Sequence, residues 1–455
     1  MPASIALVVG LALAGAQAAT PAALRLVPDT PPEPSLALTL DAAIARGLEH
    51  NLATLLADAG VDAAAGRRWT ALSDLLPQVS ADLSGLRQTV NLATFGISLP
   101  GFPEIVGPFN VYDARIGVSQ SVFDLEAIQG ARAEAAALAG SRHTARDARR
   151  LVALVVTNLY LEAQAAASRV EAGRAELENS RALHRLAQDL KSAGLVAKID
   201  VLRAEVQMEA DEQREIAREN DSAKARLALA DAIGLSPATQ PIVLADTLTY
   251  TPATAPALDA ALAQARARRE DLQAARARLS AAEARRTAAS ASRLPSVDLH
   301  ANYGTIGAAI DTARPTYAVS ATVSVPLFNG GETHGKVLEA RADVARAQAE
   351  ADALDRRIEF EVQAALLDIA AAERRAEVAR HTVELATEQE TQARDRFRAG
   401  VAGNLELVQA QAMLAGARDA YIAAVTAHHL ARAALARAIG VDERDYRRFI
   451  AGETP

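Results

Sequence analysis

The sequence predicts a mixed fold of very long α-helices and β-strands of membrane-crossing length, and three features of its 455 residues support this. The first is an internal repeat, because Phe123 aligns with Phe328 and Gly194 with Gly400 at a nearly constant offset. The second is a pair of strand-like segments in each copy, and the third is a long proline-free helical run after each pair. One architectural unit is therefore used twice.

Composition favours thin helical walls over a wide globular core. Half of the residues are hydrophobic, yet only 4% are aromatic, and alanine supplies much of the total. Large cores are normally filled by leucine, isoleucine, valine and phenylalanine, whereas alanine-rich helices pack with their backbones close together. The net charge is −8, with both signs mixed along the helices, which indicates no basic surface for nucleic acid.

Residues 1–18 are predicted to be a secretory signal peptide. An apolar stretch, 5–13, leads to Ala16-Gln17-Ala18, which fits an A-x-A cleavage site. No lysine or arginine precedes that stretch, so the true start site and the n-region stay open, and a buried N-terminal helix is the alternative. The proline-rich segment 28–34 favours export. The chain has no cysteine for a disulfide or a lipid anchor, and no later uninterrupted apolar stretch reaches roughly 18 residues.

Four segments alternate between apolar and polar residues, two within about 78–122 and two within about 296–326. From Tyr112 to Val122 the even positions are mainly apolar and the odd ones mainly polar, and from Tyr317 to Val325 the odd positions are apolar. Such strands separate lipid from water, and about ten residues cross a bilayer when tilted. A half-buried soluble sheet is the alternative. Predicted export, and the isolation of these strands among long helices, favour a membrane sheet.

Four strands are too few to close a membrane barrel. The smallest such barrels have about eight strands, and a sheet in lipid leaves no edge open. The chain is therefore expected to pool its strands with copies of itself, and three copies give twelve strands. The segments 89–110 and 305–315, which join the strands of each pair, are expected to be external loops.

Two proline-free runs, Ala127 to about Lys191 and Glu332 to about Arg398, predict helices of roughly 100 Å at 1.5 Å per residue. Each ends at a glycine, where a left-handed cap is expected. Shorter helices are expected to return over 199–233 and 405–439, and two half-length helices over 40–74 and 258–289. The predicted organisation is signal peptide 1–18, first repeat 38–235, linker and equatorial region 236–256, second repeat 257–441 and C-terminal tail 442–455.

Residues 38–441 resemble the outer-membrane efflux protein family typified by TolC. The resemblance is carried by a Leu-Pro pair before each strand pair, by the junctions after it and by the first glycine turn. These are Leu76-Pro77 and Leu294-Pro295, Phe123-Asp124 and Phe328-Asn329, and Gly194 to Val201. Membership implies a homotrimer in the outer membrane of a Gram-negative bacterium, with a twelve-stranded transmembrane β-barrel continued by a periplasmic α-helical coiled-coil tunnel.

By resemblance, the chain is the exit duct of a tripartite efflux pump or a type I secretion system. It would work with a periplasmic adaptor and an inner-membrane transporter, with no cofactor and no enzymatic chemistry. The alternative is a non-channel periplasmic coiled-coil interaction protein. The exported substrate and the particular transporter and adaptor stay open.

The family's working parts lie at the periplasmic end, which the two glycine turns would form. The resemblance places Asp200 and Glu406 at the entrance, with Lys198 and Phe397 beside them. The tyrosine–arginine latch of some members is replaced by Phe397 and Ala402, which leaves the gating mechanism open. Carboxylates are also favourable at helix N-termini, so Asp200 and Glu406 are alternatively interpreted as stabilising their helices, which is compatible with a role at the entrance. The expected adaptor-docking residues are Gly194, Leu195, Val196, Ala197, Gly400, Val401, Ala402 and Gly403.

Three other signals are given structural interpretations. The segment 330–337 nearly fits a phosphate-binding loop, but Val337 stands where the hydroxyl residue belongs, so a glycine turn is predicted. His428 and His429 are adjacent, and their side chains diverge on a helix, which argues against a shared metal. The charged run 266–270 is interpreted as a solvated helix face. No catalytic grouping or metal-ligand spacing emerges, so no enzyme is predicted.

Overall fold

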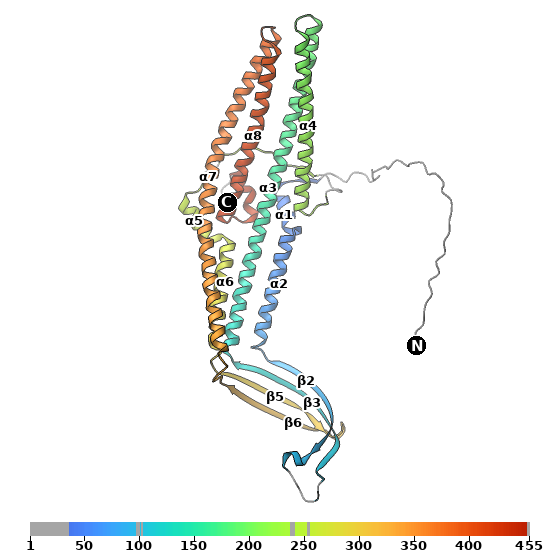
Figure 1. Cartoon of the computed structure of the whole chain (residues 1–455), viewed down its shortest axis with the longest axis vertical. Helices are drawn as coiled ribbons and strands as arrows, with labels where there is room; N and C mark the ends of the chain where they lie inside the picture. Colours follow the sequence, from blue (N-terminus) through green and yellow to red (C-terminus); the bar gives the residue numbers. More distant parts are fainter. Residues whose placement is uncertain (1–35, 97–100, 102, 237–241, 253–254, 453–455) are drawn as a thin grey trace, which may run out of the picture.

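The computed structural model describes residues 36–96, 101, 103–236, 242–252 and 255–452, so the predicted signal peptide lies outside the described residues. The described chain is long and thin, with a β-sheet at one end and two helical turns at the other (Figure 1). We call these turns, 193–197 and 399–403, the tip. We call the equator the level at which three short helices pack against the long ones. These are α1 (Leu40–His50), α5 (Leu258–Arg268) and α9 (Tyr446–Ala451).

Two helices run the length of the helical part, as the proline-free runs predict. They contain 68 and 67 residues, and each is followed by a glycine with positive φ, Gly194 at 76° and Gly400 at 71°. The N–H of Leu195 donates to the carbonyl of Leu190 at 2.8 Å, which closes the expected left-handed cap. The long helices and their returning partners are α3 (Leu125–Ser192), α4 (Lys198–Ala232), α7 (Glu332–Arg398) and α8 (Asn404–Ile439).

The half-length helices are each broken once, so the prediction of two single helices is wrong. Asn51 has extended backbone and ends α1, and its side chain accepts from the N–H of Ala53 at 2.9 Å to begin α2 (Leu52–Ser73). Arg269 likewise has extended backbone, ends α5 and precedes α6 (Glu270–Ala291), but its side chain makes no capping hydrogen bond. Both breaks lie near the equator, where the chain bends around the core.

The strands form one antiparallel sheet in the order β2-β3-β5-β6. Val118 pairs with Ala301, and Ala301 with Val319, so apolar residues line up across three strands. Gly304 lies where an added Cβ would stand 2.2 Å from the carbonyl oxygen of Ala114, so this contact requires glycine. The strands are β2 (Gln78–Asn91), β3 (Ile105–Phe123), β5 (Ser296–Gly307) and β6 (Arg314–Ser324), with a 3-10 turn, η1 (Leu92–Phe95), in the first loop.

The main apolar core lies at the equator. There β1 (Leu36–Leu38) pairs in parallel with β4 (Ile242–Leu244), which belongs to the predicted linker. The hydroxyl of Tyr160 donates to the carbonyl of Leu38 at 3.0 Å and lies 2.8 Å from Asp246 Oδ2. The predicted tail contains η2 (Glu443–Asp445) and α9, which buries Tyr446 in the same core.

Helix α3 is long and apolar enough to cross a membrane by length and composition, and 56% of its most apolar window is buried within the chain. This burial fits a core helix: the window lies against the equatorial core, which includes Val152, Val156 and Tyr160 of α3. The sheet and the long helices therefore form two distinct parts of one elongated chain (Figure 1).

Candidate functional site at the tip and the equator

The two tip turns present apolar side chains to solvent. Leu195 is 71% exposed and Val401 70% exposed, each directly after the glycine that ends a long helix. A Cβ added at Gly194 or Gly400 would meet no other atom, so glycine is required by the positive φ rather than by crowding. The eight residues predicted to dock an adaptor are thus exposed or half-exposed at the end of the chain.

Below the turns, the four long helices share a small apolar core that we call the tip core. Phe397 of α7 lies in it and is only 2% exposed. The ring thus packs among helices instead of facing solvent at the predicted entrance. The other members of the tip core are Leu183, Ala187, Val201, Ala204, Ala393, Leu407 and Ala410.

The predicted entrance carboxylates lie in the first turns of α4 and α8, and each has an arginine of the same chain nearby. Asp200 Oδ1 is 3.6 Å from an Arg203 nitrogen, and Glu406 Oε2 is 3.5 Å from an Arg396 nitrogen. Lys198 is exposed beside them. These pairs reduce the net negative charge at the tip, and the positions of the carboxylates also suit the helix dipole.

Asn404 joins the two turns, and the sequence reasoning missed it. Its side chain is buried, and its Nδ2 donates to the carbonyl of Asp200 at 2.9 Å, linking the start of α8 to the start of α4. The repeat offered a signal, because Asn404 aligns with Lys198 of the first copy, where no such bond forms. The break in the repeat marks a contact made by only one copy.

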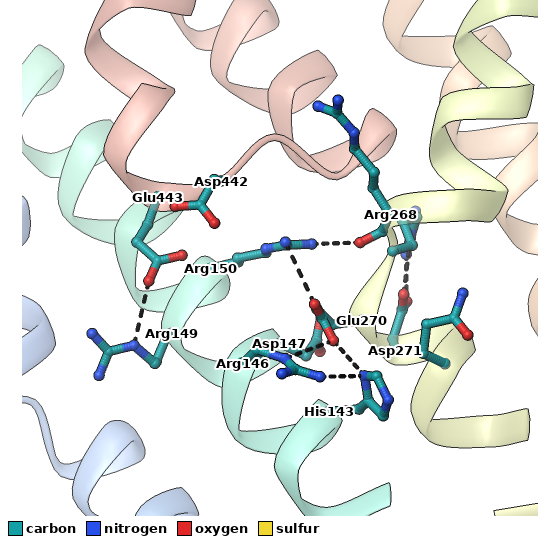
Figure 2. A network of polar contacts seen from close by, with 12 residues as sticks. His143, Arg146, Asp147, Arg149, Arg150, Arg268, Glu270, Asp271, Asp442 and Glu443 are labelled. Atoms are coloured by element: carbon teal, nitrogen blue, oxygen red, sulfur yellow. Dashed lines mark hydrogen bonds and ion pairs between the residues drawn. The ribbon is translucent and has the colours of Figure 1, made fainter. Parts of the chain in front are cut away.

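A polar network at the equator, which we call the hub, joins the break between α5 and α6 to α3 (Figure 2). Glu270, the first residue of α6, lies 2.6 Å from His143 Nδ1, 3.0 Å from Arg146 and 3.6 Å from Arg150. Arg150 also donates to the carbonyl of Arg268 at 2.6 Å, which satisfies a carbonyl at the end of α5. Three side chains of α3 thereby hold the start of α6, and one of them, Arg150, also satisfies a backbone carbonyl at the break.

The hub also includes Arg269, at the break itself, which is 3% exposed and whose guanidinium contacts the carboxylates of Asp271 and Glu361. Burial opposes ionisation, but the hydrogen bonds from this guanidinium hold the pKa of Asp271 and of Glu361 below the ordinary range. The interpretation of 266–270 as a solvated face is therefore wrong for Arg269 and for Glu270, and right for the exposed Arg266. Arg269 and Arg266 both pair with carboxylates of α7, and Glu270 is held by α3, so packing around each side chain decides which of them is buried.

The adjacent histidines lie buried near the equator. His428 is edge-on to Tyr250, with ring centroids 5.1 Å apart, and also edge-on to His429 at 5.6 Å. Burial lowers the pKa of His428 to about 4, with smaller contributions from His429 and Arg432, so its ring is neutral at pH 7. Within the part of the chain that the structure describes, no three His, Cys, Asp or Glu side chains are arranged to hold a metal.

The glycine-rich segment before α7 forms a turn, as predicted. Gly330 and Gly331 have φ of 64° and 92°, and Gly331 precedes the first residue of the helix. Lys336 pairs with Glu332 at 2.8 Å along the same helix. The lysine thus has a local structural partner.

Comparison with curated proteins and solved structures places this geometry among known relatives. Protein CyaE of Bordetella pertussis is 29% identical over 275 residues, which cover 59% of this chain and 57% of CyaE, so the match spans a little over half of that relative. The outer membrane protein VceC of Vibrio cholerae matches with a TM-score of 0.74 and 20% identity, covering 88% of this chain and 96% of VceC. The open MtrE outer membrane channel of Neisseria gonorrhoeae matches with a TM-score of 0.75 and 20% identity, and the match covers 88% of each chain.

The structural likenesses show a common fold. The family comparison goes further, because the model of the outer membrane efflux protein family matches residues 43–235 and 261–441, one segment for each copy of the repeat. These segments make up most of the chain and include the tip turns and all four strands of the sheet. The chain therefore belongs to the outer membrane efflux protein family, as its resemblance predicts, and is an efflux protein of the Gram-negative outer membrane.

Proposed function

We propose that this chain, as a homotrimer, forms a passive exit duct that crosses the outer membrane as a twelve-stranded barrel and continues through the periplasm as a helical tunnel. It would receive substrates from a periplasmic adaptor and an inner-membrane transporter, in a tripartite efflux pump or a type I secretion system. The observation that carries this proposal is the four-stranded sheet, which has an apolar outer face and two unpaired edges within one chain.

The apolar face of the sheet suits lipid. Its side chains are large and exposed: Leu83 is 85% exposed and Val319 68% exposed among the residues that the structure describes. Soluble proteins rarely leave such a patch uncovered. The other exposed residues of this face include Val79, Ile116, Val118, Leu299, Tyr303, Tyr317 and Val323.

The opposite face suits a water-filled lumen. Arg115 bonds to Asp113 at 2.7 Å and to Asn302 at 3.1 Å, so charged and amide groups line the strands on this side. The edge strands β2 and β6 carry backbone N–H and C=O groups with which lipid forms no hydrogen bonds. Pairing these strands between chains removes the free-energy cost of burying those groups in lipid. A non-channel periplasmic protein would leave both the apolar face and these edges uncovered.

The proposed trimer is tested by measuring the mass of the native assembly. Native mass measurement of the detergent-extracted protein is expected to give three chains, and unboiled samples are expected to migrate as a trimer in gels. Outer-membrane fractionation of the same cells locates the protein. A stable, membrane-inserted monomer would contradict the proposed barrel, since one chain supplies only four strands.

The tip is proposed as the part that meets the adaptor. Leu195 and Val401 each present an apolar side chain beside a glycine turn, where another helical hairpin is able to pack closely. Gly194, Val196, Ala197, Gly400, Ala402 and Gly403 complete the docking residues. Asp200, Glu406, Lys198 and Phe397 are assigned to the entrance, with Phe397 acting from inside the tip core.

Replacing Leu195 and Val401 together with glutamate is expected to abolish export, because a charge on each turn opposes burial against an adaptor. The trimer and its membrane insertion are expected to persist, since both side chains are exposed in the chain. Export is measured in cells and assembly by unboiled gels. The control is Leu385→Glu, at an exposed apolar residue of α7 away from the turns. Export that survives the double replacement would place docking elsewhere.

A further inference from the structure

The junction between β6 and α7 exposes two large apolar side chains where the sheet meets the long helices (Figure 1). Leu327 is 92% exposed and Phe328 89% exposed, whereas Phe123, which Phe328 matches in the first copy, is 44% exposed. Val325, an exposed residue of the odd-numbered apolar series of β6, lies two positions before Leu327. The apolar face of the sheet therefore continues onto this junction.

A groove beside these side chains contains basic groups. Arg293, just after the end of α6, and His334, in the first turn of α7, line it together with the two exposed apolar residues. No aspartate or glutamate is among the described residues that line the groove. Glu332 is close in sequence, but its carboxylate is paired with Lys336 at 2.8 Å. The groove therefore offers positive charge and hydrogen-bond donors to an anion.

The guanidinium of Arg293 is available to a ligand. Its side chain is exposed, and no ion pair or hydrogen bond joins it to another side chain in the part of the chain that the structure describes. Arg285, two turns earlier on α6, differs in this respect because it pairs with Glu134 of α3 at 2.9 Å. A free guanidinium presents a planar fork of N–H donors that matches two oxygens of a phosphate.

The equivalent junction of the first copy lacks this basic character. Arg293 stands opposite Leu75 when the two Leu-Pro pairs are aligned, and Asn329 stands opposite Asp124. The carboxylate of Asp124 accepts from the N–H of Ala127 at 3.0 Å and so caps α3. The second copy has thus gained a cation and lost a carboxylate at the same level of the chain. Because the shared architecture does not require this difference, it indicates a ligand at the second junction.

We propose that this groove binds the headgroup of an anionic phospholipid in the periplasmic leaflet of the outer membrane, with Arg293 on the phosphate and with Leu327 and Phe328 among the upper parts of the acyl chains. The inference rests on the proposed function, in which the sheet crosses the membrane and the helices extend into the periplasm. A zwitterionic headgroup also carries an ammonium group, and the lining of the groove provides no carboxylate to pair with it. A headgroup with net negative charge is therefore preferred.

The test compares two lipids on the full chain purified in detergent. The protein is incubated with equal amounts of phosphatidylglycerol, which is anionic, and phosphatidylcholine, which is zwitterionic, and native mass measurement after gel filtration counts the bound molecules of each. The parent is expected to retain phosphatidylglycerol preferentially. Arg293→Gln is expected to lower this preference about fivefold, the effect of one basic residue at an anionic membrane surface. Arg293→Lys is expected to keep part of it, since an ammonium lacks the planar fork.

Asn329→Asp provides a second variant, because it returns the carboxylate of the first copy to this junction. It is expected to lower the preference by repulsion, and the cap formed by Asp124 shows that an aspartate suits the start of a long helix. Leu327→Ser removes an apolar contact but no charge, so it is expected to reduce retention of both lipids. The matched control is Arg276→Gln, at an exposed arginine of α6 roughly 25 Å from the groove. This control is expected to leave the preference unchanged.

Equal retention of the two lipids by the parent would overturn the proposal. A loss in Arg276→Gln as large as that in Arg293→Gln would also overturn it, because any exposed arginine would then suffice. Displacement of phosphatidylglycerol when phosphate replaces chloride at equal ionic strength would reveal a site for free phosphate, and unchanged retention in Leu327→Ser would contradict the placement of the acyl chains. If the purified protein consists of single chains, the proposed trimeric duct fails, whereas lipid preference still tests the groove.

Discussion

Val319→Arg is expected to prevent assembly of the membrane sheet, whereas Ser320→Arg is expected to leave it intact. The two residues are neighbours near the middle of β6, and both are exposed within one chain. Their side chains point to opposite faces, since Val319 pairs with Ala301 and Ser320 with His300. An arginine facing lipid at the bilayer midplane costs about 2–4 kcal/mol, and a trimer would contain three of them.

The measurement is the fraction of protein that migrates as trimer in unboiled gels from outer-membrane fractions, together with the free energy of unfolding in lipid vesicles. Val323→Arg, on the same face as Val319 but nearer the end of β6, is expected to have a smaller effect because the penalty falls toward the interface. Equal damage from Ser320→Arg and Val319→Arg would show that the strand does not separate lipid from water.

Arg269→Met is expected to destabilise the helical part by about 3–5 kcal/mol, because removing one partner leaves the carboxylates of Asp271 and Glu361 in the hub without their main counter-charge. Arg266→Met is the matched control. It lies three residues earlier and pairs with Asp355 at 3.1 Å, but the side chain is 43% exposed and water replaces the partner. Thermal unfolding of the purified assembly, followed by helical circular dichroism, measures both. Similar losses in the two variants would contradict the role assigned to the hub.

The ion pairs of Arg269 in the hub also predict how the stability of the folded chain depends on pH. The pKa of Asp271 and that of Glu361 are lowered in the folded chain by the bonds from Arg269, so their stabilisation is complete above the unfolded pKa of about 4. It is lost as pH falls through the folded pKa values. Asp147 has the opposite sign, because burial raises its pKa. In Arg269→Met, the fall in stability between about pH 5 and pH 3 is expected to be shallower than in the parent.

Local patterns in the sequence determined the elements and their order. Alternation along 112–122 and 317–325 specified strands with two unlike faces, and the absence of proline along α3 and α7 specified helices of 68 and 67 residues. Gly194 and Gly400 marked the ends of those helices, since a positive φ is a requirement of the residue and its immediate neighbours. The repeat and the family resemblance then located the tip turns.

Only the tertiary structure decided how side chains far apart in sequence meet. Arg269 and Arg266 lie in one charged run and both pair with carboxylates of α7, yet the first is buried against Glu361 and the second stays 43% exposed beside Asp355. Phe397 packs inside the tip core, and Asn404 reaches the carbonyl of Asp200, 204 positions earlier in the chain. Helical periodicity describes which residues share a face, but the partner of that face is set by the packing of separate helices. The burial of each charged side chain, and with it the strength of its interactions, is therefore a property of the folded chain.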